Sequence, residues 1–152
     1  MIDRRKFLIA AAAAPLAGAF ARPALAMTPE IYAEGGIAID GSDTVAYFEG
    51  RGPVAGSAAH SVDWKGATWQ FANAANAEKF RADPEAFAPQ YGGWCAWAVS
   101  RNYTAPTVPH AWSLVDGKLY LNFSRSVQAR WSLNKSGNIA RGDANWPTVL
   151  NA

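Results

Sequence analysis

The chain has 152 residues, of which 50% are hydrophobic, with 14 basic and 12 acidic side chains. The excess of positive charge lies in the first 26 residues, where Arg4, Arg5, Lys6 and Arg22 stand against Asp3. The remainder therefore has 10 basic groups (14 less 4) and 11 acidic groups (12 less 1), a net charge of −1. This balance gives no basic surface for nucleic acid or an anionic membrane, and we exclude both as partners.

The first 26 residues have the organisation of an export signal. Arg4-Arg5 precedes Lys6-Phe7-Leu8, an alanine-rich apolar run follows, and Ala24-Leu25-Ala26 is an A-x-A cleavage site. A proline and a glycine interrupt the run, which is short for a bilayer span; an uncleaved anchor is the alternative. We predict a twin-arginine-type signal peptide over residues 1–26, recognised by the twin-arginine export machinery. The product is then periplasmic, with no stable membrane anchor.

The remaining length suits one domain, with residues 27–36 as a polar lead and residues 37–152 as the domain. Ile37-Ala38-Ile39 alternates briefly into Asp40-Gly41, which predicts a short strand ending in a turn. Residues 43–48 form a compact apolar element.

Two β-hairpins are predicted. Apolar and polar residues alternate on both sides of Lys65-Gly66, which indicates strands at residues 60–65 and 67–72. Asp116-Gly117 stands between the apolar runs 111–115 and 118–123, and Asp-Gly in this setting is a strong hairpin signal.

Short helices are predicted around the hairpins. Asn73 occupies an N-cap position before an apolar three-residue repeat, so a helix should run to about Ala82. Asp83-Pro84 should open a further helical turn to about Ala88. Ser124 or Ser126 can cap a later helix, and Gly137 or Gly142 is expected to end helical turns.

These elements together predict an α+β fold. We expect a small antiparallel sheet built from two β-hairpins, covered by short helices, in a single domain.

The stretch Tyr91-Gly92-Gly93-Trp94-Cys95 holds the chain's single cysteine. Two adjacent glycines allow a sharp turn or a close approach, so we expect Cys95 just beyond a tight bend. A single cysteine cannot form an internal disulfide, which leaves either a buried inert thiol or a free functional one.

Several motifs in the same order resemble the exported YHS domain-containing (seleno)protein family. They are Asp43-Thr44-Val45-Ala46-Tyr47-Phe48, Gly66-Ala67-Thr68-Trp69-Gln70-Phe71-Ala72, Pro89-Gln90-Tyr91-Gly92-Gly93-Trp94-Cys95-Ala96, Asp116-Gly117-Lys118-Leu119-Tyr120-Leu121-Asn122 and Asn145-Trp146-Pro147. Some members of that family carry selenocysteine at the position of Cys95, so the resemblance implies redox or metal chemistry there. The chain departs from metal-associated YHS domains at Phe71-Ala72-Asn73, where those domains carry a cysteine.

The leading hypothesis is a small periplasmic YHS-type protein with a site centred on Cys95. The site would bind a transition metal such as copper or zinc, or carry out thiol redox chemistry in an accessory role with a periplasmic redox or metal-handling protein. His60 and His110 are the candidate further metal ligands. The aromatic residues expected to line a pocket around the thiol are Tyr91, Trp94 and Trp97.

The alternative is a non-catalytic structural or protein-interaction module in which the aromatic residues pack and Cys95 is buried and inert. A true enzyme with its own substrate is the third interpretation. The sequence contains no phosphate loop and no nucleophile elbow, so hydrolase functions are set aside.

Overall fold

A computed structural model describes residues 27–152, so the predicted signal peptide, residues 1–26, lies outside the described residues. In chain order the elements are β1 (Ala33–Glu34), β2 (Ile37–Ala38), η1 (Ile39–Gly41), α1 (Thr44–Phe48), β3 (Ser57–Trp64), β4 (Ala67–Phe71), α2 (Ala74–Ala82), α3 (Pro84–Phe87), η2 (Gln90–Gly93), α4 (Ala96–Ser100), β5 (Trp112–Val115), β6 (Lys118–Leu121), α5 (Arg125–Ser132), α6 (Lys135–Asn145) and η3 (Thr148–Asn151), where η marks a 3₁₀ turn.

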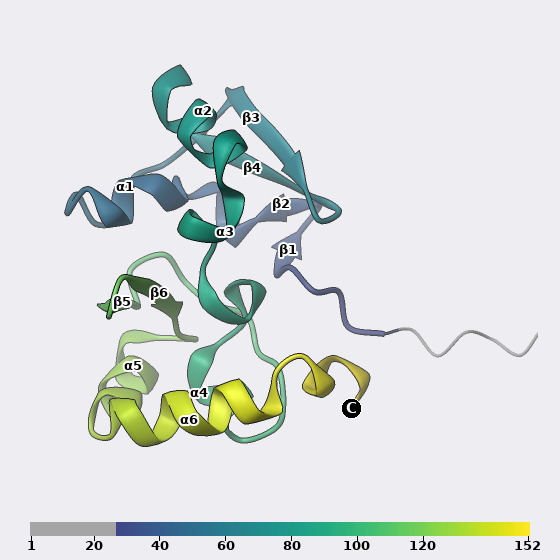
Figure 1. Cartoon of the computed structure of the whole chain (residues 1–152), viewed down its shortest axis with the longest axis vertical. Coiled ribbons are helices and arrows are strands. Elements are labelled where there is room, and N and C mark those ends of the chain that lie inside the picture. Colours follow the sequence, from purple (N-terminus) through teal and green to yellow (C-terminus); the bar gives the residue numbers. More distant parts are fainter. Residues whose placement is uncertain (1–26) are drawn as a thin grey trace, which may run out of the picture.

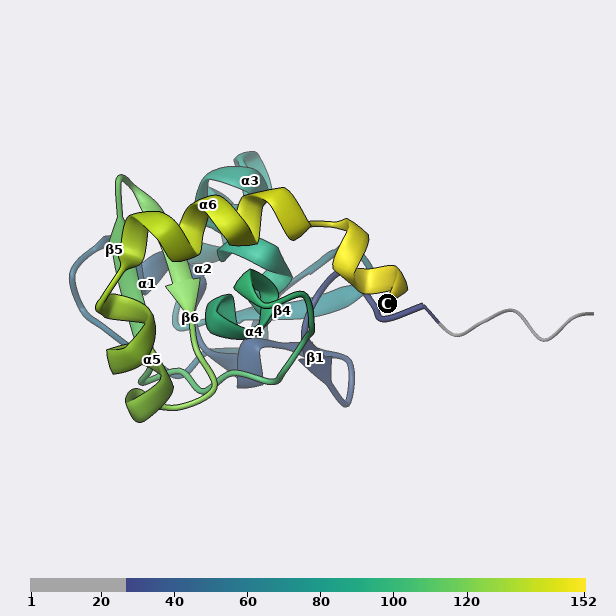
Figure 2. The same ribbon diagram turned by 90° about the horizontal axis from the view of Figure 1, so that it is seen from below.

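The elements gather into two halves (Figure 1). One half holds the sheet β1-β2-β4-β3 with α1, α2 and α3, and the other holds the β5-β6 hairpin with α4, α5 and α6. The turn η2 lies between them. Figure 2 shows α6 lying across the second half and the C-terminus beside the start of the described chain, where Thr28 N–H donates to the Leu150 carbonyl at 3.1 Å.

The first predicted hairpin is β3 and β4, which pair in antiparallel fashion across the turn at Lys65 and Gly66. Strand alternation turns Trp69 and Phe71 toward the core, where each ring packs on Phe80 of α2 at centroid distances of 5.0 and 5.1 Å. The start of α2 is fixed as predicted, because the Asn73 side chain accepts a 2.8 Å hydrogen bond from the backbone N–H of Asn76.

The second predicted hairpin, β5 and β6, forms a two-stranded sheet of its own. Successive side chains of a strand point to opposite faces. Leu119 and Leu121 therefore enter the core beside the four-stranded sheet, whereas Tyr120 enters a second core with Trp131 and Val149. Strand β6 thus contributes side chains to both hydrophobic clusters and connects the two halves.

The last two helices begin at side-chain caps. Ser124 accepts from the Val127 N–H at 3.2 Å at the start of α5, as predicted, and Asn134 caps α6. The prediction that Gly137 or Gly142 ends a helical turn is wrong, because α6 continues through both. Gly142 lies against the ring of Tyr91. This close contact, and not the end of a helix, explains why position 142 is a glycine.

The predicted α+β fold with two hairpins and short helices is confirmed. The structure adds that the larger sheet is mixed, because β2 pairs in parallel with β4. Asp83 precedes α3 as expected, but its carboxylate makes no capping hydrogen bond. Within residues 27–152 no helix has both the length and the apolar character needed to cross a membrane.

Candidate functional site

The glycine pair makes the tight bend that the sequence predicts. Gly92 and Gly93 have φ values of 63° and 86°, and Tyr91 before them also lies in the left-handed region, at φ 60° and ψ 31°. A Cβ at Gly92 would lie 1.7 Å from the carbonyl oxygen of Glu30. Glycine is needed here because the segment before β1 crosses directly over the bend, where Tyr32 N–H donates to the Gly92 carbonyl at 2.9 Å.

Cys95 follows this bend and is buried, with an exposed fraction of 1%. Its thiol donates a long, 3.5 Å hydrogen bond to Oδ1 of Asn122, and the sulfur accepts one from the Phe123 N–H at 3.3 Å. The same Asn122 oxygen accepts from the Trp97 N–H at 3.0 Å. Asn122 therefore ties the end of β6 to the start of α4 around the sulfur.

Burial raises the pKa of the Cys95 thiol above its ordinary value, and nearby backbone N–H groups of Ala98, Phe123 and Trp97 only partly oppose this. A thiol of this kind is protonated at neutral pH. Because the thiolate is the nucleophile and the soft metal ligand, the folded protein presents Cys95 in its unreactive form.

The predicted metal ligands do not come together. Among residues 27–152, no three side chains of His, Cys, Asp or Glu converge closely enough to hold a metal ion. His60 lies half-buried on β3, and His110 is exposed beside a shallow hollow that Asp40 also lines. The groups around the sulfur are an amide and backbone N–H donors, which do not fit a copper or zinc site.

The three aromatic residues predicted to line one pocket face different places. Trp94 packs on Tyr32 at a centroid distance of 5.2 Å and donates its indole N–H to the Pro29 carbonyl. Trp97 lies under the guanidinium of Arg101, 3.2 Å from the ring centroid. Of the predicted trio, only Tyr91 lines the cleft described next, and Cys95 takes no part in its lining.

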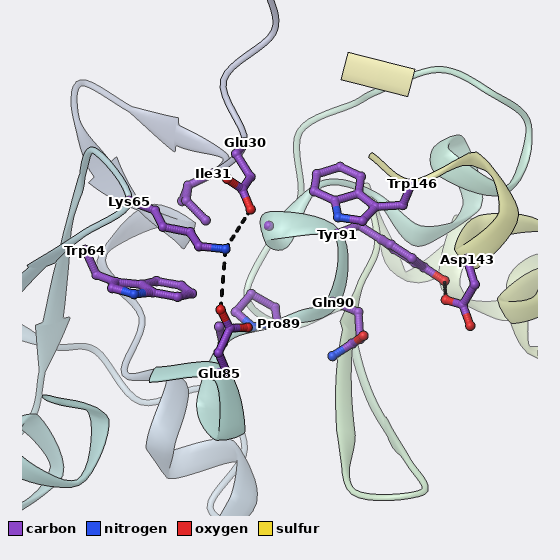
Figure 3. A pocket seen from close by; sticks show the side chains of 12 residues that line it. Glu30, Ile31, Trp64, Lys65, Glu85, Pro89, Gln90, Tyr91, Asp143 and Trp146 are labelled. Carbon is purple, nitrogen blue, oxygen red and sulfur yellow. Dashed lines mark hydrogen bonds and ion pairs between the residues drawn. The ribbon is translucent and has the colours of Figure 1, made fainter. Parts of the chain in front are cut away.

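A cleft of about 210 Å³ opens where the two halves meet (Figure 3). It is more enclosed than the hollows beside His110, Asp63 and Trp94. We name it the Trp64–Trp146 cleft, after the two tryptophans that line it. Its other charged or aromatic lining residues are Glu30, Lys65, Glu85, Tyr91 and Asp143.

One wall of the cleft is built around an ammonium group. Lys65 Nζ lies 2.7 Å from a Glu30 carboxylate oxygen, 3.5 Å from a Glu85 oxygen and 4.7 Å from the centroid of Trp64. The hydrogen bond to Glu30 raises the pKa of Lys65 above its ordinary value, so the pairing favours the charged ammonium. These ion pairs are substantially exposed and contribute only about 0–1 kcal/mol each to stability.

The floor and the opposite wall are held by Tyr91. Its hydroxyl donates a 2.9 Å hydrogen bond to Asp143 of α6, and its ring packs on Trp146 at a centroid distance of 5.9 Å. A left-handed non-glycine residue costs about 1 kcal/mol or more, and such strain persists only where surrounding contacts impose it. Tyr91 is therefore held by contacts of both its ring and its hydroxyl.

Sequence reasoning missed both the cleft and Asn122. The cleft residues come from separate segments, and no spacing in the sequence joins one segment to another; of these residues only Tyr91 was predicted to line a pocket. For Asn122 there was a signal: it is a polar residue at the end of an apolar strand, and burial of such a residue calls for hydrogen-bond partners, which its Oδ1 finds in Cys95 and Trp97.

Three comparisons, with models of protein families, with curated proteins and with solved structures, find no match to this chain.

Proposed function

We propose that the mature chain is a periplasmic, non-catalytic binding module of the YHS type, exported by the twin-arginine route, in which Cys95 is a packing residue. The observation that carries the proposal is the burial of Cys95 at 1% exposure, with its sulfur enclosed by Asn122 and the backbone of Phe123. A buried, protonated thiol has neither the access nor the charge state that nucleophilic or redox chemistry requires.

The absence of a grouped ligand set among residues 27–152 supports the same choice over a metal site. A cleft with charged and aromatic walls, whose lining does not include Cys95, gives the module a place to bind a ligand without chemistry at the thiol.

The experiment is alkylation of the native protein with iodoacetamide, followed by mass spectrometry. Native Cys95 should react at least about a hundredfold more slowly than the same thiol in denaturant, because reaction must wait for local opening. A matched control is Leu133→Cys in a Cys95→Ser background, since Leu133 is 88% exposed. Rapid alkylation of native Cys95, or a stoichiometric metal on protein isolated from the periplasm, contradicts the proposal.

The second candidate function is thiol chemistry at Cys95. It is favoured by the Phe123 N–H on the sulfur, because donors of this kind stabilise a thiolate once it forms. This candidate predicts alkylation of the native protein with an apparent pKa below about 8.5.

A further inference from the structure

We infer that the Trp64–Trp146 cleft binds a small organic cation, an alkylammonium or guanidinium group, between its Lys65 wall and the wall formed by Asp143 and Trp146. The inference rests on the proposed function, since it supplies the ligand class of a non-catalytic binding module.

The first argument is charge. Three carboxylates line the cleft, those of Glu30, Glu85 and Asp143, against the single ammonium of Lys65, a formal excess of two negative charges. Lys65 already contacts two of the carboxylates, so it has little capacity left to attract an anion. The field in the cleft favours a cation and opposes a phosphate or carboxylate ligand.

The second argument is the chemistry already present on one wall. The Lys65 ammonium lies over the face of Trp64 and between two carboxylates, which are the contacts that a receptor for an alkylammonium provides. The opposite wall also carries an indole and a carboxylate, those of Trp146 and Asp143, and the Tyr91 side chain connects them, with its ring on Trp146 and its hydroxyl donating to Asp143 (Figure 3). The contacts of Lys65 thus show that an indole and carboxylates of this cleft can hold an ammonium group.

The third argument is size and preorganisation. A volume of about 210 Å³ accommodates a group of a few heavy atoms, since a cavity of about 150 Å³ holds benzene. The Tyr91 hydroxyl fixes Asp143 at 2.9 Å, and the Tyr91 ring supports Trp146. Binding therefore requires little ordering of the protein, which lowers its entropic cost.

The test uses three probes of equal length and different charge: n-butylammonium, n-butanol and butyrate, each titrated into ¹⁵N-labelled mature protein at constant ionic strength. The indole N–H resonance of Trp146, assigned with Trp146→Phe, reports binding. We expect n-butylammonium to bind at least about tenfold more tightly than n-butanol, from cation–π and carboxylate contacts combined. Butyrate should not bind.

The variants separate this site from a general effect of acidic charge. Asp143→Asn and Glu85→Gln should each weaken n-butylammonium binding by about two- to fivefold. Lys65→Met should strengthen n-butylammonium binding, because Trp64 and the carboxylates of Glu30 and Glu85 then no longer contact the lysine ammonium. Glu78→Gln is the control and should leave affinity unchanged, since Glu78 is an exposed residue of α2 paired with Arg81.

The inference is overturned if n-butylammonium binds no better than n-butanol, if butyrate binds more tightly, or if glucose shifts the Trp146 resonance at lower concentration than the amine. It is also overturned if Glu85→Gln and Lys65→Met both leave the amine's affinity unchanged. Alkylation of Cys95 in the same sample reports separately on the proposed function, so either result can fail without the other.

Discussion

Gly142 of α6 lies directly against the side chain of Tyr91. A Cβ at Gly142 would lie 2.4 Å from the Tyr91 hydroxyl oxygen and 2.7 Å from the ring carbon that carries it. The same hydroxyl is held by Asp143, so the ring cannot move away without losing that hydrogen bond. The missing side chain at Gly142 therefore sets how closely α6 approaches the floor of the cleft.

Gly142→Ala should lower the free energy of unfolding by about 1–3 kcal/mol, measured by urea denaturation. In a helix interior without such a contact, alanine is about 1 kcal/mol more stabilising than glycine. A loss of stability in Gly142→Ala would therefore indicate the contact with Tyr91. Ala144→Gly, at an exposed position of the same helix, should show only that ordinary propensity cost. A stabilising Gly142→Ala would mean that Tyr91 is free to move.

Asp43 is a buried carboxylate that organises three segments. Oδ1 accepts from Val45 N–H at 2.9 Å, and Oδ2 accepts from Ala72 N–H and Asn76 Nδ2, both at 2.9 Å. Asp43→Ala leaves these donors buried without an acceptor and should cost about 3 kcal/mol or more by chemical denaturation.

The control for Asp43 is Asp63→Asn, because Asp63 is exposed and accepts only a hydroxyl hydrogen bond from Thr68. We expect this change to cost less than about 1 kcal/mol. Equal losses in the two variants would argue that Asp43 has no special structural role.

Tyr47 should make the fold sensitive to alkali. Burial raises the pKa of Tyr47 to about 12, and its hydroxyl donates a 2.8 Å hydrogen bond to the Pro109 carbonyl. Below pH 10, which is about the pKa of tyrosine in the unfolded chain, Tyr47 makes its full contribution to the free energy of unfolding. As pH rises from about 10 to 12 the unfolded chain loses its proton first, so about 2–3 kcal/mol of stability is lost.

Urea denaturation at pH 9 and pH 12 measures this effect. Tyr47→Phe should start from a lower stability at pH 9 but show a smaller fall, because it has no hydroxyl to ionise. Tyr103→Phe is the control, since Tyr103 is 48% exposed and should leave the fall unchanged. An identical fall in the Tyr47 variant would assign the alkaline loss to other groups.

The export prediction concerns Arg4 and Arg5. Replacing both with lysine keeps the charge but removes the arginine pair that the twin-arginine route reads, so unprocessed precursor should accumulate in the cytoplasm. Cell fractionation and immunoblotting measure this. Unchanged periplasmic yield would indicate the general secretory route.

Local features of the fold were predictable because local chemistry determines them. The turns at Lys65-Gly66 and Asp116-Gly117 and the caps at Asn73 and Ser124 lie where the sequence places them. The parallel pairing of β2 with β4 joins segments about thirty residues apart, and nothing in either short strand specifies that partner.

The candidate site was less predictable because contacts between distant segments form it. The sequence predicted the glycine bend before Cys95. The burial of the thiol, however, depends on Asn122 and Phe123, which follow β6. The cleft needed side chains from segments as distant as Glu30 and Asp143, and only the folded chain brings these together.

Because the N-terminal segment crosses over Gly92, the first residues that the structure describes have a structural role. Glu30 is the fourth residue after Ala26, and it supplies both the carbonyl that covers the glycine bend and a carboxylate of the cleft wall. A chain that begins a few residues after Met27 would therefore uncover the bend and open the cleft on one side. Recombinant protein intended for ligand studies should begin at Met27, with any affinity tag placed at the other end.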